Sequence, residues 1–176
     1  MTDRVCAAPF AGHIVTRIVD VTGPLPPEFA AHLGRLGDGE RRALLHGPLG
    51  GVEGGRKAHL FGIEADGAIR GAARLIDGGR GASALASLAV EPAWRGQGLG
   101  TALSARLVYA ARALGVRSLA LVWAGEDPAM VRIAARFGAR TLGVDERRRM
   151  ARIDVAELWL ADAEQPAVRR GAFASA

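Results

Sequence analysis

The sequence predicts a single α/β domain built on a mixed β-sheet, and three observations support this fold class. Apolar runs of strand length alternate along the chain with longer stretches whose apolar residues recur at helical spacing. Asp66-Gly67 separates two alternating runs and is a typical hairpin turn. The apolar run 84–90 leads through a glycine loop into a long amphipathic pattern, so a strand, a loop and a helix follow one another there.

The N-terminal third is predicted to contain one strand and two short helices. Residues 13–21 alternate branched and polar side chains, as strands do, and the proline-rich segment 23–27 breaks the chain after them. Apolar residues at helical spacing predict helix over 28–46, followed by a glycine-rich loop over 47–55. The glycines that divide the helical stretch in two are Gly34, Gly37 and Gly39.

A hairpin and a central strand are predicted for the middle of the chain. Strands at 59–63 and 68–75 flank the turn, and a second loop at 77–81 connects them to the strand 84–90. The pair Glu91-Pro92 ends that strand, because proline cannot continue a ladder of backbone hydrogen bonds.

Two further helices have clear start and stop signals. Leucine and alanine recur at helical spacing over 99–114, and Gly115 is a natural C-terminal stop. Asp127 followed by Pro128 predicts the start of another helix, with a side-chain cap and a proline in the first turn. That helix is predicted to end at Gly138.

The remaining strands complete the order of elements. An apolar run predicts a strand at 118–124, and residues 139–144 and 149–155 predict a final strand pair. We therefore expect one domain over 1–162, followed by a flexible tail over 163–176.

Composition restricts the classes of function. A chain of 176 residues, 49% hydrophobic and 23% charged, fits one soluble globular domain. The formal charge is +5, and every basic residue except Lys57 is an arginine. These arginines are spread among acidic residues instead of clustering, so no nucleic-acid partner is expected.

The cysteine count and the hydropathy pattern bear on location and on metals. Cys6 is the single cysteine, so neither an internal disulfide nor a zinc cluster of cysteines can form. No apolar run approaches the ~18 residues that a membrane span needs, and no signal peptide is recognised. We expect a cytoplasmic protein with no bound metal and no membrane partner.

The loop between the strand 84–90 and the helix 99–114 carries the main functional signal. It reads Arg95-Gly96-Gln97-Gly98-Leu99-Gly100. A glycine loop that opens a helix presents free backbone N–H groups to an anion without side chains in the way. A dinucleotide site would need G-x-G-x-x-G and an acidic residue ~20 positions later. Here the spacing is G-x-G-x-G and the first later acid is Glu126, so a different phosphorylated ligand is favoured over both a dinucleotide and a plain turn.

The same residues resemble a known family. Arg95-x-x-Gly98-x-Gly100 is similar to the signature of the GNAT superfamily of acyl-CoA-dependent N-acetyltransferases, and the likeness covers about residues 13–155, most specifically 84–140. This resemblance implies a mostly antiparallel central sheet with helices on both faces. It also implies that the fourth and fifth strands splay apart.

The resemblance further implies that acetyl-CoA is the co-substrate. Backbone groups of the fourth strand would then bind the pantetheine arm, and amides of the loop would hold the pyrophosphate. Arg95 would either face a phosphate or brace the loop. The implied cofactor-binding residues are Leu88, Ala89, Val90, Arg95, Gly96, Gln97, Gly98, Leu99, Gly100 and Thr101.

The usual acid and base of such enzymes are absent from this sequence. The strand 84–90 has no carboxylate, and the position at which many members carry a tyrosine is Ala134. One hypothesis is catalysis by orientation and a backbone oxyanion site. A second is that Ser87 or Glu126 substitutes, with His59 and Glu64 as further candidates. A third is a catalytically weak acyl-CoA-binding module.

The acceptor is predicted only by class. The expected reaction is direct transfer of an acetyl group to a primary amine, either of a small molecule or of a protein lysine. Cys6 is too remote from these motifs to suggest an acyl-enzyme. We expect a monomer or a homodimer.

Overall fold

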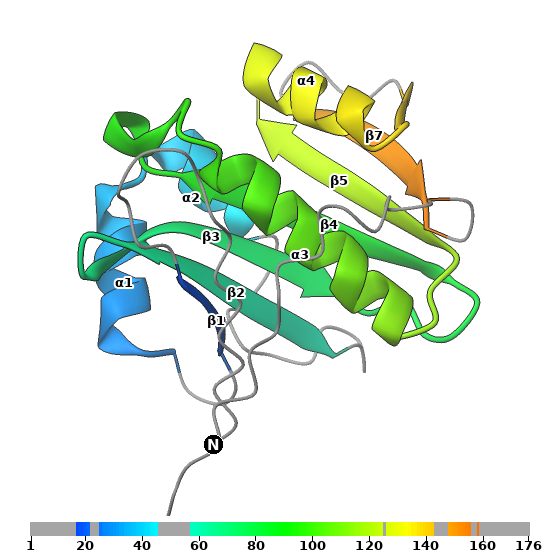
Figure 1. Ribbon diagram of the computed structural model, residues 1–176, viewed down its shortest axis with the longest axis horizontal. Helices are drawn as coiled ribbons and strands as arrows, with labels where there is room; N and C mark the ends of the chain where they lie inside the picture. The colour runs from blue at the N-terminus through cyan, green and yellow to red at the C-terminus, as the bar shows by residue number, and fades with distance from the viewer. Residues whose placement is uncertain are drawn as a thin grey trace, which may run out of the picture.

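A twisted β-sheet forms the centre of the described part of the chain and carries helices on both faces (Figure 1). The computed structural model describes residues 17–21, 25–45, 57–124, 126–142, 148–155 and Leu158. The strands follow in the order β1 (Arg17–Val21), β2 (Ala58–Ala65), β3 (Ala68–Ile76), β4 (Ser83–Val90), β5 (Ser118–Ala124), β7 (Arg148–Asp154) and β6 (Arg140–Leu142).

The sheet is mixed, as the order of elements predicts, and mostly antiparallel, as the family resemblance implies. Strands β1 to β4 form an antiparallel meander, and β7 pairs antiparallel with both β5 and β6. The neighbours β4 and β5 are parallel, and the helix α3 (Leu99–Ala113) connects them. A parallel pair needs such a crossover, because the chain must return to the same edge before it starts the second strand.

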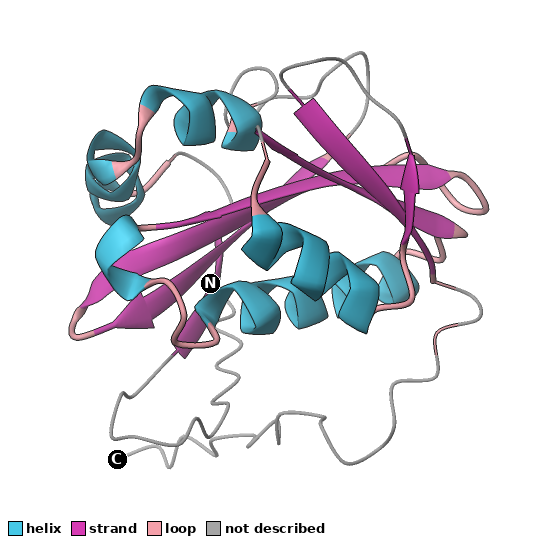
Figure 2. Cartoon of the chain, turned by 90° about the horizontal axis from the view of Figure 1, so that it is seen from above, coloured by secondary structure: helices cyan, strands magenta, loops and turns pink. Residues whose placement is uncertain are grey.

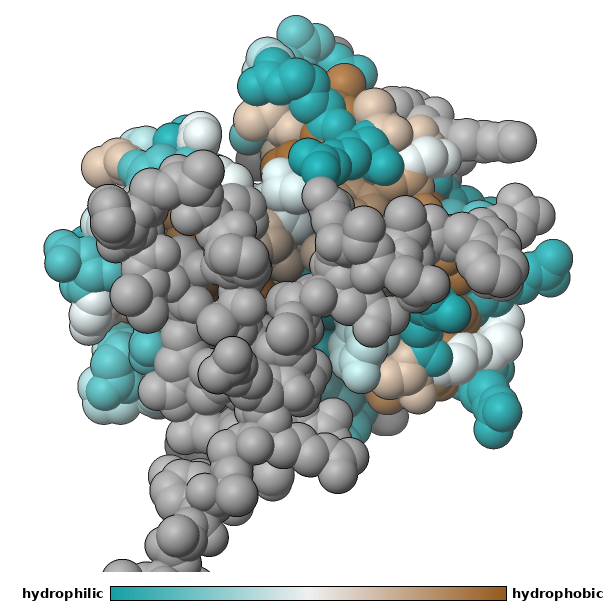
Figure 3. All heavy atoms as spheres, viewed as in Figure 1, coloured by the Kyte–Doolittle hydropathy of each residue, from teal (hydrophilic) through white to brown (hydrophobic). Residues whose placement is uncertain are grey.

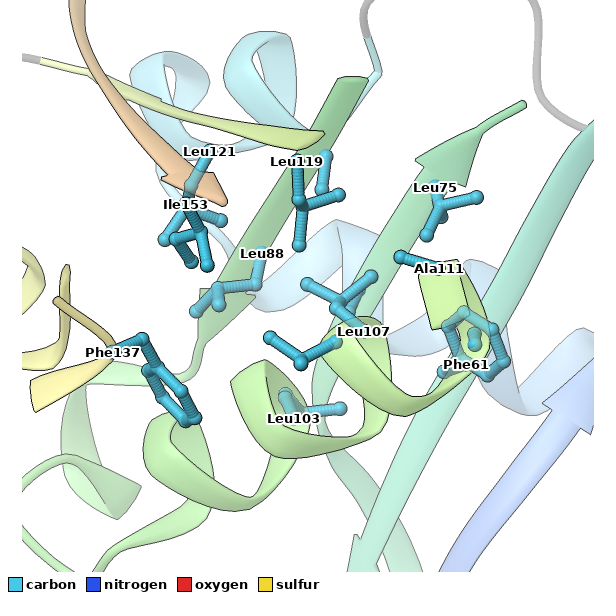
Figure 4. Packing of buried hydrophobic residues seen from close by; sticks show 14 of the residues in the cluster. Phe61, Leu75, Leu88, Leu103, Leu107, Ala111, Leu119, Leu121, Phe137 and Ile153 are labelled. Atoms are coloured by element: carbon cyan, nitrogen blue, oxygen red, sulfur yellow. The ribbon is translucent and has the colours of Figure 1, made fainter. Parts of the chain in front are cut away.

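Helices cover both faces of the sheet (Figure 2). On one face α1 (Pro27–Arg35) and α2 (Asp38–Leu44) pack on β3 and β4, around residues such as Phe29 and Leu44. On the other face α3 and α4 (Pro128–Arg136) cover a larger apolar cluster, which includes Leu88, Leu103, Leu107 and Leu121 (Figure 4). The outer side of α4 is hydrophilic, as Figure 3 shows at the top of the view.

Local signals account for most element boundaries. Asp66 and Gly67 have φ of 51° and 68°, so the hairpin between β2 and β3 contains two left-handed residues, as a tight type I′ turn requires. Asp127 caps α4 by accepting hydrogen bonds from the amides of Ala129 (2.8 Å) and Met130 (3.3 Å). Gly115, with φ of 69°, follows the end of α3.

One boundary prediction is corrected. The sequence predicts that Gly34 and Gly39 interrupt the helical stretch together with Gly37, but Gly34 lies inside α1 and Gly39 inside α2. The break occurs where Leu36 and Gly37 adopt extended backbone, and Gly37 becomes the N-cap of α2. An exposed helical glycine costs only about 1 kcal/mol, which the packing of Phe29 and Leu33 outweighs.

Strands β4 and β5 separate part of the way along their length, which confirms the predicted splay. Their pairing runs from Ser83 with Ser118 to Ser87 with Val122, and no described pair continues it. Beyond that point 88–90 remain paired with β3, whereas 123–124 pair with β7. The sheet therefore opens into a wedge whose apex lies at Ser87 and Val122.

Several predictions lie wholly or partly outside the described residues. These are the start of the first strand at 13–16, the glycine-rich loop at 47–55, the end of the strand 139–144 and the tail at 163–176, so the boundary of the single domain stays a prediction. None of the described helices has the length and apolar character needed to cross a bilayer.

Candidate functional site

The N-terminus of α3 forms a cradle of free backbone amides. Gly98, its N-cap, is left-handed with φ of 85°, and no side chain caps the helix. The first helical hydrogen bond found there runs from the amide of Ala102 to the carbonyl of Gly98 (3.0 Å). The amides of 99–101 therefore have no partner within the helix, and the dipole of α3 adds partial positive charge at the same place. Such a site favours an anion.

Close packing at the start of α3 favours a glycine at position 100. A Cβ atom built on it would lie 3.1 Å from Cδ1 of Ile133 and 3.9 Å from Cδ1 of Leu88. The first turn of α3 therefore packs against α4 on one side and against β4 on the other. The sequence predicts a glycine here for close approach to a phosphate, and the structure adds the contact with Ile133 as a second reason.

Arg95 braces the loop that leads into α3. Its Nε donates to the carbonyl oxygen of Val90 (3.1 Å), and its guanidinium forms an ion pair with Glu40 of α2. The side chain is 45% exposed. These contacts fit the bracing role expected for Arg95, and its role at a phosphate stays a prediction.

The open edge of β4 faces the wedge. The amide of Glu91 donates to the carbonyl of Arg70 on the β3 side (2.9 Å). Since the hydrogen-bonding direction alternates along an antiparallel strand, Ala89 also turns toward β3. Leu88 and Val90 consequently turn their backbone N–H and C=O groups toward the side from which β5 has separated.

The two candidate catalytic side chains lie in different environments. Ser87 is buried on the α2 face, where its Oγ donates to the carbonyl of Leu44 (3.3 Å). Glu126 follows β5, and its exposed carboxylate accepts a hydrogen bond from Nη2 of Arg149 (2.6 Å). The further candidates, His59 and Glu64, lie on β2, which β3 separates from β4. The structure therefore does not gather these residues in one place.

A buried ionic network at the root of the loop was not foreseen from the sequence. Glu91, which follows β4 directly, is buried, and its Oε1 accepts from Nε of Arg35 (2.8 Å) and faces Nδ1 of His32 (3.0 Å). Its Oε2 accepts from Nη1 of Arg70 (3.3 Å). The guanidinium of Arg70 also lies 5.0 Å above the centre of the Trp94 ring, in the loop itself. Helix α1 and strand β3 are thus tied to the loop before α3.

The protonation states within this network follow from burial. Burial alone would raise the pKa of Glu91, but hydrogen bonds from His32 and Arg35 outweigh it and hold that pKa below its ordinary value. Burial lowers the pKa of His32, although the bond to Glu91 partly opposes this. A neutral imidazole beside a carboxylate must donate from the nitrogen that faces it, so Nδ1 carries the hydrogen.

The described residues contain no group of three or more His, Cys, Asp or Glu side chains that could hold a metal ion. The arrangement is instead that of an anion site connected to an open strand edge. Such an arrangement can hold a long ligand that has a phosphate at one end and amide groups along its length.

Comparison with known proteins agrees with this arrangement. The model of the acetyltransferase (GNAT) family matches residues 33–139. The mycothiol acetyltransferase of Nocardia farcinica (strain IFM 10152) is 43% identical over 90 residues, which are 51% of this chain and 28% of that protein. The chain therefore matches less than a third of the length of that relative.

Two solved structures share the fold. The GNAT domain of S. lividans PAT superposes with a TM-score of 0.64 at 14% identity, covering 79% of this chain and 90% of that domain. A structure described as an acyl-CoA N-acyltransferase from Klebsiella pneumoniae subsp. pneumoniae MGH 78578 gives a TM-score of 0.62 at 21% identity. The match covers 80% of this chain and 97% of that one. At such identities the likeness shows the fold alone.

Proposed function

Because the chain belongs to the acetyltransferase (GNAT) family, we propose that it is an N-acetyltransferase that transfers the acetyl group of acetyl-CoA directly to a primary amine. One observation carries this proposal: the uncapped N-terminus of α3 stands beside the wedge between β4 and β5. An anion site and an unpaired strand edge thus adjoin each other, as a ligand with both a pyrophosphate and an amide-bearing arm requires.

The residues fit acetyl-CoA at both ends of that arrangement. The pyrophosphate would bind the amides of 99–101, where the left-handed Gly96 and Gly98 expose backbone without a Cβ in the way. The amides of the pantetheine arm would pair with the open backbone groups of Leu88 and with the N–H of Val90, whose carbonyl already accepts from Arg95. Arg95, held by Glu40 and Val90, would keep the loop in place.

Orientation is the main source of catalysis in this proposal. The amine nitrogen attacks the thioester carbonyl carbon, a C–N bond forms and the C–S bond breaks, and coenzyme A leaves as a thiol with the proton that the nitrogen loses. A well-oriented pair of reactants can contribute several kcal/mol, about 7–11 at best. Ala134 and the carboxylate-free strand β4 favour this route over side-chain acid–base catalysis. Roles for Ser87 and Glu126 stay predictions.

A small-molecule amine is the acceptor that we propose over a protein lysine. The support is the 43% identity over 90 residues to a mycothiol acetyltransferase, whose name specifies a small-molecule product. The absence of the usual catalytic base also supports a second candidate function, that of a catalytically weak acyl-CoA-binding module. The proposed cytoplasmic location is supported by the single cysteine, Cys6, which suits a reducing compartment.

A calorimetric titration with acetyl-CoA, coenzyme A and NAD tests the proposal. We expect the wild type to bind both coenzyme A species and not NAD. Gly98→Glu places a carboxylate in the amide cradle and should abolish binding by charge repulsion. Gly79→Glu is the matched control, because Gly79 also has positive φ (91°), has open space around its Cβ position and lies in the loop between β3 and β4.

The outcomes separate the two candidate functions. Absence of binding to folded wild type at ~1 mM acetyl-CoA would refute the proposed function. Equal losses in both glutamate variants would mean that strain, and not the cradle, decides binding. Binding that Gly98→Glu abolishes, without acetylation of any amine in a screen, would favour the binding module.

A further inference from the structure

Trp123 carries a buried hydrogen-bond donor that the fold does not use. The residue is 3% exposed and belongs to the apolar cluster beneath α3 and α4. Its indole Nε1–H is buried and has no hydrogen-bond partner in the described part of the chain. An indole nitrogen can only donate, and native proteins leave few buried donors unsatisfied. A purely apolar side chain would fill this position at lower cost.

The position of Trp123 in the sheet is as informative as its burial. The last pair between β4 and β5 is Ser87 with Val122, so Trp123 is the first residue of β5 beyond the apex of the wedge. Its counterpart on β4, one step past Ser87, is Leu88. Both side chains point to the α3 and α4 face, because both belong to the cluster on that face.

Leu88, which shares a cluster with Trp123, also packs against the amide cradle. Cδ1 of Leu88 lies 3.9 Å from the Cβ position of Gly100, the second residue of α3. Figure 4 shows Leu88 in the same cluster as Leu103 of α3 and Leu121 of β5. Trp123 follows Leu121 by two residues and so lies on the same face of β5. An arm that starts at the cradle and runs into the wedge along β4 therefore leads toward the apex, where Trp123 is the first residue of β5 past the last pair with β4.

We propose that the Nε1–H of Trp123 donates a hydrogen bond to the thioester carbonyl oxygen of bound acetyl-CoA. This inference rests on the proposed function, and it assigns a donor to the atom that becomes negative when the amine attacks. A donor in a water-poor site stabilises such an oxyanion more strongly than the neutral carbonyl. The reaction itself is unchanged: the C–N bond forms, the C–S bond breaks, and Trp123 neither gains nor loses a proton.

Trp123→Phe tests the proposal through binding and stability, without a known acceptor. Phenylalanine keeps an aromatic ring in the cluster and lacks the N–H group. We expect the affinity for acetyl-CoA to fall about 3- to 10-fold, the usual value of one neutral hydrogen bond. The affinity for coenzyme A should not change, because coenzyme A has no thioester carbonyl. Without ligand, the melting temperature of Trp123→Phe should be equal to or higher than that of Leu121→Ala, a variant that only loses volume.

The results that overturn the proposal are distinct from those that overturn the proposed function. Equal affinity of Trp123→Phe and wild type for acetyl-CoA would remove the donor role, and so would equal losses for both ligands. If the wild type binds neither ligand, the proposed function itself fails.

A measurement on the wild type covers the case in which the variant does not fold. In ¹⁵N-labelled protein, the Trp123 indole resonance is assigned by elimination with Trp94→Phe and Trp159→Phe. We expect it to move downfield and to exchange more slowly with solvent in the acetyl-CoA complex than in the coenzyme A complex. Identical indole resonances in the two complexes would overturn the proposal.

Discussion

The buried charge of Glu91 depends on partners that lie far away in the sequence. Glu91 keeps its charge while buried because Arg35 and Arg70 each donate a hydrogen bond to its carboxylate, and neutral His32 donates a third. A buried carboxylate with these partners removed would be strongly destabilising, since its desolvation would no longer be compensated. The pH dependence of stability should therefore reflect this network.

Acid should destabilise the protein first through His32 and then through Glu91. Burial depresses the pKa of His32 in the folded state, so below about pH 6.5 the unfolded chain binds a proton that the folded protein resists. Stability thus falls as pH drops from 7 through the range below 6.5. The depressed pKa of Glu91 contributes stability that is present above about pH 4.3 and is lost as pH falls through its folded pKa.

His32→Asn isolates the first effect. Asparagine can still donate to Glu91 but does not titrate, so the fall in the urea midpoint between pH 7 and 5 should be smaller than in the wild type. The pKa of His59 is also lowered by burial, and it contributes equally in both proteins. The same slope in both proteins would show that His32 is not the titrating group.

At the scale of elements, helix starts and ends follow from local sequence, whereas contacts between elements do not. The cap of Asp127, the turn at Asp66 and the loop before α3 were predictable because each is set by residues within a few positions. The network of Glu91 joins residues 56 and 59 positions apart, and no periodic pattern encodes such pairs.

The same distinction limits the prediction of the site. The glycine signature located the amide cradle, and the resemblance placed the open edge of β4 beside it. Strand alternation already puts Ser87 and Leu88 on opposite faces. Which face carries α2, and hence the bond from Ser87 to the carbonyl of Leu44, depends on how the helices cross the sheet.

Two glycines in helices should respond differently to replacement by alanine. Gly34 in α1 has no atom within 4 Å of its Cβ position, so Gly34→Ala should stabilise the protein by up to about 1 kcal/mol. Gly100→Ala should gain nothing, because its Cβ would meet Cδ1 of Ile133 at 3.1 Å.

A double variant tests whether the contact with Ile133 is the reason that Gly100→Ala gains no stability. Ile133→Val removes the opposing methyl group, so the free energy of unfolding of Gly100→Ala with Ile133→Val should exceed the sum expected from the single variants. Denaturant titration of the single and double variants measures this coupling. Strict additivity would show that the contact with Ile133 does not restrict position 100.

At the scale of the whole molecule, one apolar cluster joins most of the described elements. It contains side chains from β1 to β5, from β7, and from α3 and α4, and Leu107 of α3 is fully buried within it (Figure 4). A cluster shared in this way makes the loss of any one element costly to the others. The described part of the chain should therefore unfold as one cooperative unit, as the predicted single domain over 1–162 requires.

Leu107→Ala should lower the free energy of unfolding by about 2–5 kcal/mol, because it opens a cavity at the centre of that cluster. Circular dichroism, which follows the helices, and tryptophan fluorescence should report the same shifted midpoint in urea. Val131→Ala on the outer side of α4, where the side chain is 49% exposed, should stay within about 0.5 kcal/mol of the wild type. Two separate transitions, with only one moved by Leu107→Ala, would mean that the chain divides into independent units. In that case the wedge between β4 and β5 could open without unfolding the α1 and α2 face, and the bond network of Glu91 would mark the boundary between the two units.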